Sequence, residues 1–408
     1  MVFRFRARIP VCDFTDGSAN IEVQPAAGLS TIRGLMSRRL IMFTSLPRVG
    51  GHSTLTYGLC RLLRPHLDSI EVWCKTMPEH GHSEAVARQI EALGCRVIRI
   101  SDDAGRVNWR GVLSAVASTW RGPKPVFFTL AMRHLSLALS ALVRSENSIY
   151  YHITHDLNAG TVKRLKFYAS FFRRIVFICP ATYDAFPGAA ADPQYTWVPQ
   201  SSEIPVRNLE RLAAERDAVL EPGTPIRFGL IGRLTEDKGS AAMVEFFRAC
   251  AVPCELHVAG TGPFAETFRE MAAAQLPAAR VRFYGAYDPS EREAFLRTFF
   301  AGIDCLLVPS QDEWETLSMA TLESLQHGVP AVLCRTGGLT SFAHPDLGPA
   351  AEEVVRLVAP ADYAETLVRL ANRPRRAQAE TVAECRAYYD KHFSDAVVLQ
   401  RWLSVVAP

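Results

Sequence analysis

The chain has 408 residues, of which 48% are hydrophobic and 21% charged, and these proportions are typical of a soluble globular protein. No apolar run approaches the ~18 residues that a transmembrane helix needs. The first residues, MVFRFRARIPVCDF, lack the hydrophobic core of a signal peptide. We therefore expect a cytoplasmic protein whose ten cysteines are mostly reduced core residues.

The net charge of +3 conceals a difference between the two halves of the chain. Residues 1–200 carry 24 Lys and Arg against 14 Asp and Glu, whereas residues 201–408 carry 21 against 28. This split predicts two domains with different partners. The basic half would face anionic lipid or an acidic acceptor, and a solvated surface without a partner is the alternative.

Residues 1–38 show no clear periodicity, and we treat them as an N-terminal extension without an assigned role. From residue 39 on, apolar runs alternate with helical patterns, which indicates a parallel sheet covered on both faces. The predicted strands are LIMFTS (40–45), IEVWC (70–74), RVIRI (96–100), VFFTL (126–130), IYYHI (149–153) and RIVFICP (174–180). The predicted helices lie around 52–64, 83–93, 109–119, 133–144 and 160–173.

The stretches YTWVPQSSEIPV (195–206) and LEPGTP (220–225) carry the Pro, Gly and Ser of a linker. The strand pattern then restarts, with IRFGLIG (226–232), CELHVAG (254–260), VRFYGA (281–286), DCLLVP (304–309) and PAVLC (330–334), and a last helical stretch covers 379–406. We therefore predict an α/β chain of two doubly wound, Rossmann-like domains with a ligand cleft at the strand carboxyl ends. The predicted boundaries are 39–205, 206–380 and, for the C-terminal helix, 381–408.

Two cations, Arg233 and Lys238, follow the first strand of the second domain in FGLIGRLTEDKG. At the carboxyl edge of a parallel sheet they suit a diphosphate, because Arg can bind two oxygens at once and Lys adds a point charge. Plain surface charge is the alternative. Gly262, in a Gly-x-Gly turn after the next strand, is a weaker candidate that a simple tight turn also explains.

The stretch ETLSMATLE follows another strand of the second domain, so it opens onto the same edge. Ser318 is predicted to cap a helix there. The free backbone N–H groups of Leu317, Ser318 and Met319 would then form an anion site. The carboxylates of Glu315 and Glu323 would lie on either side of a bound diphosphate, where each would accept hydrogen bonds from hydroxyl groups of sugar and ribose.

In the first domain, Gly50 and Gly51 lie just ahead of a helix and would allow close backbone approach to phosphate or sugar. The loop is neither a dinucleotide fingerprint nor a P-loop. His155 and Asp156 follow the strand IYYHI, and His155 is a candidate site residue. His152 would point to the opposite face of that strand, so a metal shared by the two histidines is not expected. No Asp-x-Asp pair, the usual carboxylate site for a metal-bound nucleotide diphosphate, occurs in the chain.

The segment TVKRLKFYASFFRR (161–174) interleaves five Lys and Arg residues with three Phe residues. A basic, aromatic amphipathic helix can lie on an anionic membrane. Peripheral contact with the cytoplasmic face of a membrane is therefore one expectation. A crossover helix that packs its aromatic rings on the sheet is the other, and the two are partly compatible.

Together these motifs resemble the retaining glycosyltransferases of the GT-B fold, family 4, also called glycosyl transferases group 1. The resemblance covers about residues 39–400 and is strongest from 226 to 340. It rests on the Glu-x7-Glu spacing of Glu315 and Glu323, the GRL and KG residues at Arg233 and Lys238, the Gly-x-Gly-Pro turn at 260–263, the Gly pair at 337–338, the Gly pair at 50–51 and His155.

The resemblance implies a role for each residue of the donor site. Arg233 and Lys238 would neutralise the donor diphosphate, together with the N–H groups around Ser318. Glu323 would bind the ribose hydroxyls, and Glu315 would orient the transferred sugar. The C-terminal helix would cross back to the first domain, as in the GT-B fold.

The resemblance also implies the reaction, which is front-face sugar transfer with retention and without a metal. His155, with Asp156, would lie near the donor sugar and the acceptor, and the leaving diphosphate oxygen would help to deprotonate the acceptor while cations stabilise its charge. The donor would be a UDP- or GDP-sugar and the acceptor a glycan or lipid-linked molecule of cell-surface polysaccharide type. We expect no further cofactor and no nucleic-acid partner.

Three departures from the family pattern concern the donor more than the fold. Thr316 and Ser318 stand where the family usually has Gly or Pro, PQSSE replaces the usual Pro-Asn-Gly between the domains, and GGLTSF lacks an acidic residue. Two alternative functions are therefore open, a nucleotide-sugar 2-epimerase of the same fold and a non-catalytic nucleotide-sugar-binding protein.

Overall fold

The computed structural model describes residues 39–47, 51–78, 81–130, 134–202, 225–250, 253–277, 280–287, 291–348, 350–371 and 378–407. All of them belong to one compact unit, Arg38–Pro408. The N-terminal extension, Gly50 and most of the linker stretch 220–225 lie outside the described residues.

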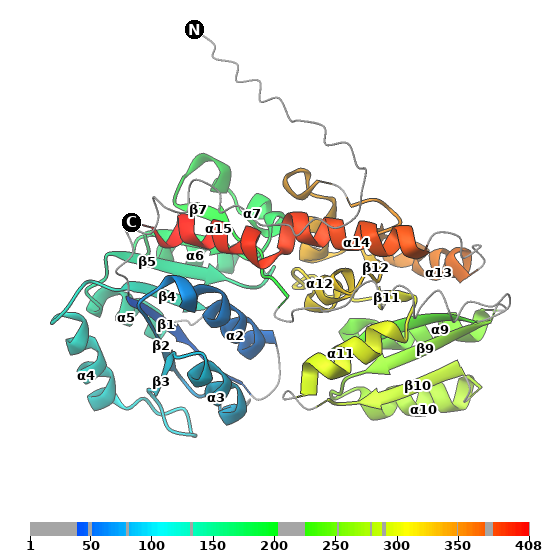
Figure 1. The fold of residues 1–408 in the computed structure, drawn as a ribbon, viewed down its shortest axis with the longest axis horizontal. Helices are drawn as coiled ribbons and strands as arrows, with labels where there is room; N and C mark the ends of the chain where they lie inside the picture. The colour runs from blue at the N-terminus through cyan, green and yellow to red at the C-terminus, as the bar shows by residue number, and fades with distance from the viewer. Residues whose placement is uncertain are drawn as a thin grey trace, which may run out of the picture. The chain divides into compact units, whose positions relative to one another are not determined.

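A parallel sheet of seven strands forms the first part of the described chain (Figure 1). Its strands are β1 (Arg39–Thr44), β2 (Ser69–Cys74), β3 (Arg96–Arg99), β4 (Val126–Leu130), β5 (Asn147–His152), β6 (Arg174–Phe177) and β7 (Tyr195–Trp197). Their order is β3-β2-β1-β4-β5-β6-β7. Every residue of β4 and five of the six in β1 are buried, as expected for strands covered on both faces.

The crossover helices of this sheet are α2 (Gly51–Leu63), α3 (Glu84–Ala92), α4 (Trp109–Thr119), α5 (His134–Leu142) and α6 (Ala159–Tyr168), and the short α7 (Pro180–Ala185) follows β6. Right-handed crossovers place α2 and α3 on one face and α4, α5 and α6 on the other. Side chains cap several helix starts; that of Asn158 accepts from the N–H of Thr161 at the start of α6. The helix predicted over 160–173 is too long at its C-terminal end, because α6 ends at Tyr168.

The second sheet has six parallel strands. They are β8 (Ile226–Ile231), β9 (Cys254–Ala259), β10 (Val281–Gly285), β11 (Cys305–Val308), β12 (Ala331–Cys334) and β13 (Val355–Val358), in the order β10-β9-β8-β11-β12-β13. Its helices are α9 (Ser240–Ala249), α10 (Ala265–Gln275), α11 (Arg292–Ala301), α12 (Met319–Gln326) and α13 (Tyr363–Ala371). The two sheets confirm the prediction of two doubly wound domains.

Two edge strands, β7 and β13, were not predicted from the sequence. β7 has only three residues and lies in the stretch 195–206 that we interpreted as linker, so that interpretation is wrong at its start. β13 is half-buried and has no continuous apolar run. Both pair with one neighbour only, β6 and β12 respectively, and an edge strand needs less apolar sequence than a central one.

The predicted C-terminal helix is two helices, α14 (Gln378–Phe393) and α15 (Asp395–Val406), separated by Ser394 in an extended conformation. α14 packs on α12 of the second sheet. α15 packs on the first domain, where the ring of Trp402 makes an edge contact with Phe128 at 5.3 Å. The C-terminal segment therefore crosses back to the first domain, as expected.

Nine cysteines lie among the described residues, and all nine are buried with free thiols. This agrees with their expected place in the core. Within the described part of the chain, no helix is long and apolar enough to cross a bilayer.

Candidate active site

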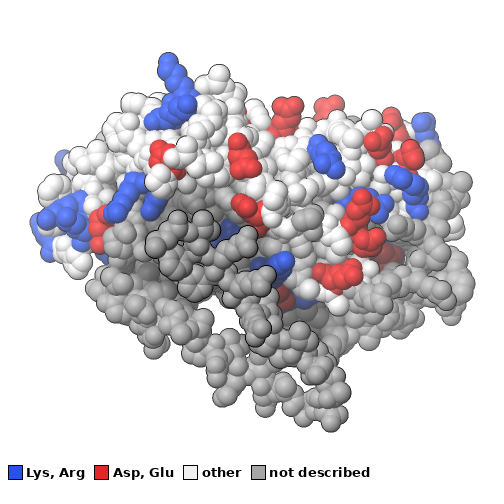
Figure 2. Space-filling view, turned by 90° about the horizontal axis from the view of Figure 1, so that it is seen from above, with Lys and Arg blue, Asp and Glu red and all other residues white. Residues whose placement is uncertain are grey.

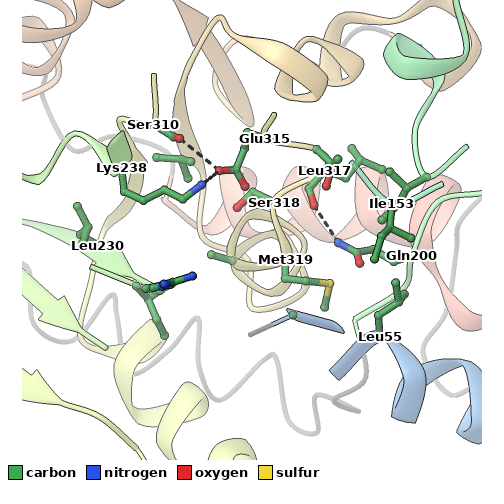
Figure 3. Close-up of a pocket in the computed structure, with 18 of the residues that line it drawn as sticks. Leu55, Ile153, Gln200, Leu230, Lys238, Ser310, Glu315, Leu317, Ser318 and Met319 are labelled. Carbon is green, nitrogen blue, oxygen red and sulfur yellow. Dashed lines mark hydrogen bonds and ion pairs between the residues drawn. The ribbon is translucent and has the colours of Figure 1, made fainter. Parts of the chain in front are cut away.

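A cavity of about 370 Å³ lies at the carboxyl ends of both sheets (Figure 3). Open parallel sheets bind their ligands at this edge, next to the point where the strand order reverses. The first domain contributes Gly51, His52, Leu55, Ile153, Ile178 and Gln200 to its lining. The second domain contributes residues 230–233, Lys238, residues 307–310 and residues 315–320. The predicted cleft between two facing domains is therefore present.

The amino end of α12 forms one wall of this cavity. Ser318 caps the helix, and its side chain accepts a hydrogen bond from the N–H of Thr321 at 3.4 Å, as predicted. Leu317, Ser318 and Met319 all line the cavity. N–H groups in the first turn of a helix have no intrahelical partner, so this wall presents partial positive charge to a ligand.

Gln200 links the start of α12 to the first domain, and the sequence prediction missed it. Its side-chain N–H donates to the carbonyl of Leu317 at 2.8 Å, and Gln200 itself is buried (Figure 3). The residue belongs to PQSSE, which we interpreted only as a departure from the family pattern. The departure of this segment from the family pattern was a signal in the sequence that the segment has a different role here. The hydrogen bond could not be predicted, because Leu317 lies 117 positions further along the chain.

Lys238 and Glu315 point toward each other across the cavity wall and form an ion pair (Figure 3). Asp312 lies 3.5 Å from the Lys238 ammonium, and the hydroxyl of Ser310 donates to Glu315 at 3.2 Å. Burial lowers the pKa of Lys238, but attraction by Glu315 and Asp312 outweighs it, so that the pKa is raised. The ammonium therefore stays charged at neutral pH.

Arg233 is exposed and lines the same cavity on the loop after β8. Together with Lys238 and the amino end of α12, it gives the cavity three sources of positive potential. A guanidinium can bind two oxygen atoms of one anion, and the ammonium adds a point charge. The arrangement suits a ligand with two adjacent phosphates.

Gly262 supports the Arg233 loop rather than the cavity itself. It is not among the residues that line the cavity. A Cβ atom at this position would lie 2.2 Å from the carbonyl oxygen of Leu234, whose N–H donates to Thr261 at 3.0 Å. The two loops therefore touch through their backbones, and glycine allows this close approach.

The glycine pair 337–338 supports the loop of Glu315 in the same way. The N–H of Gly338 donates to the carbonyl of Glu315 at 2.7 Å. A Cβ atom on Gly338 would lie 2.7 Å from the Cα atom of Thr316, and Gly337 has a φ of 45°. This pair therefore holds the Glu315 carboxylate in position through the backbone.

Glu323 lies away from the cavity. Its carboxylate forms an ion pair with Arg292 at the start of α11, and Glu323 is only 3% exposed. Burial raises the pKa of this carboxyl, and the Arg292 guanidinium acts in the opposite direction. The sequence prediction placed Glu323 by its distance along the helix and did not include its ion pair with Arg292. The contact between Glu323 and the ribose stays a prediction.

His155 and Asp156 lie beside the cavity but are not among the residues that line it. The imidazole of His155 hydrogen-bonds to the hydroxyl of Thr182 at 2.8 Å, and its backbone N–H donates to the carbonyl of Trp314 at 3.2 Å. Burial lowers the pKa of His155. The carboxylate of Asp156 accepts from Thr161 at 3.0 Å and so supports the start of α6. The roles given to both residues stay predictions.

Gly51 and His52 bring the first domain to the cavity at the start of α2. A Cβ atom on Gly51 would meet no atom within 4 Å, so the protein itself does not require glycine there. His52 was not predicted; its ring hydrogen-bonds to Thr44 at 3.1 Å. Burial lowers the pKa of His52 to about 4, which leaves a neutral imidazole in the cavity at neutral pH.

Metal ligands are a separate question. Over the described residues, no group of three or more His, Cys, Asp and Glu side chains has the arrangement of a metal site.

Comparison with known proteins assigns the second domain. Residues 225–373 match the family described as glycosyl transferases group 1. The chain is 30% identical over 152 residues to glycogen synthase of Nitrosomonas eutropha, which covers 37% of this chain and 29% of that protein. It is 33% identical over 166 residues to a GDP-mannose-dependent alpha-(1-6)-phosphatidylinositol dimannoside mannosyltransferase of Mycobacterium tuberculosis, which covers 40% of this chain and 41% of that protein. The match thus spans less than half the length of either relative.

The fold as a whole matches solved structures. Anabaena Alr3699/HepE in complex with UDP superposes with a TM-score of 0.67 at 15% identity, over 90% of this chain and 99% of that one. The structure of the same protein with UDP-glucose superposes with a TM-score of 0.65 at 15% identity, over 89% of this chain and 97% of that one. The second domain therefore matches the group 1 glycosyltransferase family over residues 225–373, and the chain as a whole has the GT-B fold.

Proposed function

We propose that this protein transfers a sugar from a UDP- or GDP-sugar to a glycan or lipid-linked acceptor, with retention and without a metal or other cofactor. The observation that carries the proposal is the cavity in which Arg233, Lys238, the amino end of α12 and Glu315 meet. Three positive groups beside one carboxylate fit a diphosphate that is joined to a hydroxyl-rich sugar.

In the proposed reaction, the bond between the sugar C1 and the diphosphate oxygen breaks, and a new bond forms from C1 to the acceptor oxygen on the same face. The acceptor proton passes to the leaving diphosphate oxygen. Arg233, Lys238 and the N–H groups at the start of α12 would stabilise the negative charge that grows on the diphosphate. Glu315 would hold the sugar through its hydroxyls, which fixes C1 for attack. His155 would contact the sugar or acceptor from the first domain.

Two relatives support the substrate classes. HepE binds UDP and UDP-glucose in its solved complexes, and the mycobacterial relative is named for GDP-mannose and a phosphatidylinositol dimannoside. A nucleotide sugar and a lipid-linked or glycan acceptor of the cell surface are therefore the first substrates to test. We propose that the protein works in the cytoplasm, or on the cytoplasmic face of a membrane where a lipid-linked acceptor would be reached.

The first experiment is a thermal-shift screen against UDP-, GDP- and ADP-sugars, because a bound donor raises the apparent stability. The stabilising donor is then incubated with lipid-linked and glycan acceptors in EDTA, and the anomeric configuration of the product is read by NMR. We expect transfer with the donor's configuration. An inverted product, or a loss of activity that only added metal restores, would overturn the retaining or metal-independent part.

The same assay separates the alternatives. A nucleotide-sugar 2-epimerase would convert the donor to its C2 epimer with no acceptor present. A non-catalytic binding protein would show the thermal shift but no product with any acceptor. Either outcome would overturn the transferase proposal while leaving the fold assignment intact.

A further inference from the structure

Large exposed hydrophobic side chains are concentrated on one side of the first domain. Eight such side chains are exposed among the described residues, and six of them lie on α4, α5 and α6 or just after these helices. They are Trp109, Leu113, Trp120, Leu142, Phe167 and Phe171, with exposed fractions between 40% and 59%. Single exposed apolar side chains are ordinary, but a cluster of this kind marks an interaction surface.

On α4 the apolar side chains form one stripe. Trp109 and Leu113 are four residues apart, and Trp120 follows after seven more, so all three lie on the same face of the helix. The indole N–H of Trp120 donates to the carbonyl of Leu142 at 3.2 Å, and the Arg144 guanidinium lies 5.9 Å from the indole centre. The stripe on α4 is therefore continuous with the end of α5.

A second set of contacts joins the segment after α6 to the start of β5, the strand that follows α5, and the Arg173 guanidinium also donates to the carbonyl of Glu146 between α5 and β5 at 3.5 Å. The N–H of Arg173 donates to the hydroxyl of Ser148 at 3.0 Å, and that hydroxyl donates to the carbonyl of Phe171 at 3.4 Å. The rings of Phe167 and Phe171 then meet with their centres 5.1 Å apart. The six exposed side chains thus belong to one surface, which we call the α4–α6 face.

The α4–α6 face is strongly basic. The segments 109–124, 134–146 and 159–174 carry nine Lys and Arg residues and a single acidic residue, Glu146. Figure 2 shows one side of the molecule, on which Lys and Arg side chains gather at the left end while both signs alternate on the right. Because two copies of a face with this charge would repel each other, the charge argues against self-association through it.

We propose that the α4–α6 face docks on the surface of an anionic phospholipid bilayer. Indole and phenyl rings are suited to the boundary between headgroups and acyl chains, and Lys and Arg beside them would bind lipid phosphates. This corrects the expectation of a single amphipathic helix over 161–174, because α6 ends at Tyr168 and Phe172 is buried. The docking surface comes instead from three helices. The inference rests on the proposed function, since a lipid-linked acceptor lies at such a surface.

Vesicle flotation tests the proposal with the full chain. Phosphatidylcholine vesicles with about 30% phosphatidylglycerol should bind the protein, and pure phosphatidylcholine vesicles should not. One variant neutralises three exposed cations of the face (Arg121→Gln, Lys124→Gln, Lys166→Gln), and a second removes apolar contact (Trp109→Ala, Leu113→Ala). The first variant should weaken binding by about tenfold or more, because each cation near the surface contributes about fivefold. The second should weaken binding by about tenfold or more as well, because membrane binding increases with the apolar area that is buried.

A matched control neutralises three exposed arginines of the second domain, Arg248→Gln, Arg297→Gln and Arg335→Gln, and should bind like the parent. Equal binding by the parent and both α4–α6 variants would overturn the proposal. So would equal losses in the control variant, or a dimer by light scattering that Trp109→Ala, Leu113→Ala dissolves. Donor binding by thermal shift is measured on the same samples. Normal donor binding without vesicle binding overturns only the proposed docking surface. Vesicle binding without binding of any donor overturns only the proposed function.

Discussion

Glu323 of α12 forms a buried ion pair with Arg292 of α11, so the second glutamate of ETLSMATLE packs inside the second domain while the first, Glu315, faces the cavity. The two carboxylates of one motif therefore have different surroundings. Breaking a buried pair by removing one partner leaves a charge without compensation.

We therefore expect Glu323→Gln to lower the free energy of unfolding by about 3 kcal/mol, because Arg292 loses its charged partner. Urea unfolding measures the change. The double variant Arg292→Leu, Glu323→Leu should recover most of the loss, since two apolar side chains can replace a buried pair. A single variant as stable as the parent would contradict the structural role. The donor KM of the folded double variant then tests the ribose contact, and a large rise would show that Glu323 reaches the donor.

Substitutions of Lys238 and Glu315 should affect different kinetic quantities, donor binding for Lys238 and turnover for Glu315. Lys238→Ala removes the cation that pairs with Glu315 and Asp312, so that two uncompensated carboxylates face an anionic donor. We therefore expect both weaker donor binding and a fall in kcat/KM of about 100-fold or more. Glu315→Gln should lower kcat more than donor affinity, because it removes a contact to the sugar rather than to the phosphates. Isothermal titration and initial rates give both quantities.

The control for these two variants is Lys391→Ala, which removes an exposed lysine on α14. Its kinetics should equal those of the parent. Unchanged kcat/KM in both Lys238→Ala and Glu315→Gln would show that the cavity is not the reaction site.

The backbone contact between Gly338 and the Glu315 loop gives a third prediction. Gly338→Ala places a Cβ atom 2.7 Å from the Cα atom of Thr316, so the loop has to move. We expect a loss of about 1–3 kcal/mol in stability, as for other overpacked sites, together with a lower kcat. Gly122→Ala is the matched control, because a Cβ atom there meets nothing within 4 Å. Equal behaviour of the two variants, in urea unfolding and in rate, would refute the support role.

The sequence predicts those parts of this molecule that depend on local pattern. Central strands such as β4 are buried on both faces and so read as unbroken apolar runs, and the Ser318 cap follows from local helix chemistry. The short edge strand β7 has no such run. Gln200 and Arg292 were missed because each acts through a partner distant in sequence, Leu317 and Glu323 respectively. Such contacts exist only once the domains are assembled.

The last prediction concerns His152, which is 3% exposed and lies between the rings of Tyr150 and Phe177. Burial lowers the pKa of His152 from 6.5 to about 4. Below about pH 6.5 this histidine therefore binds a proton in the unfolded chain but stays neutral in the native state. The free energy of unfolding should then fall as the pH drops from 6.5 toward 4. Above pH 6.5 this group should make no difference. For one histidine the loss reaches about 3 kcal/mol near pH 4, at about 1.4 kcal/mol per unit. Urea unfolding of the parent and of His152→Asn over this range measures it, with the exposed His134→Asn as control. If the parent and His152→Asn lose stability in parallel, His152 is protonated in the native state and the assignment fails.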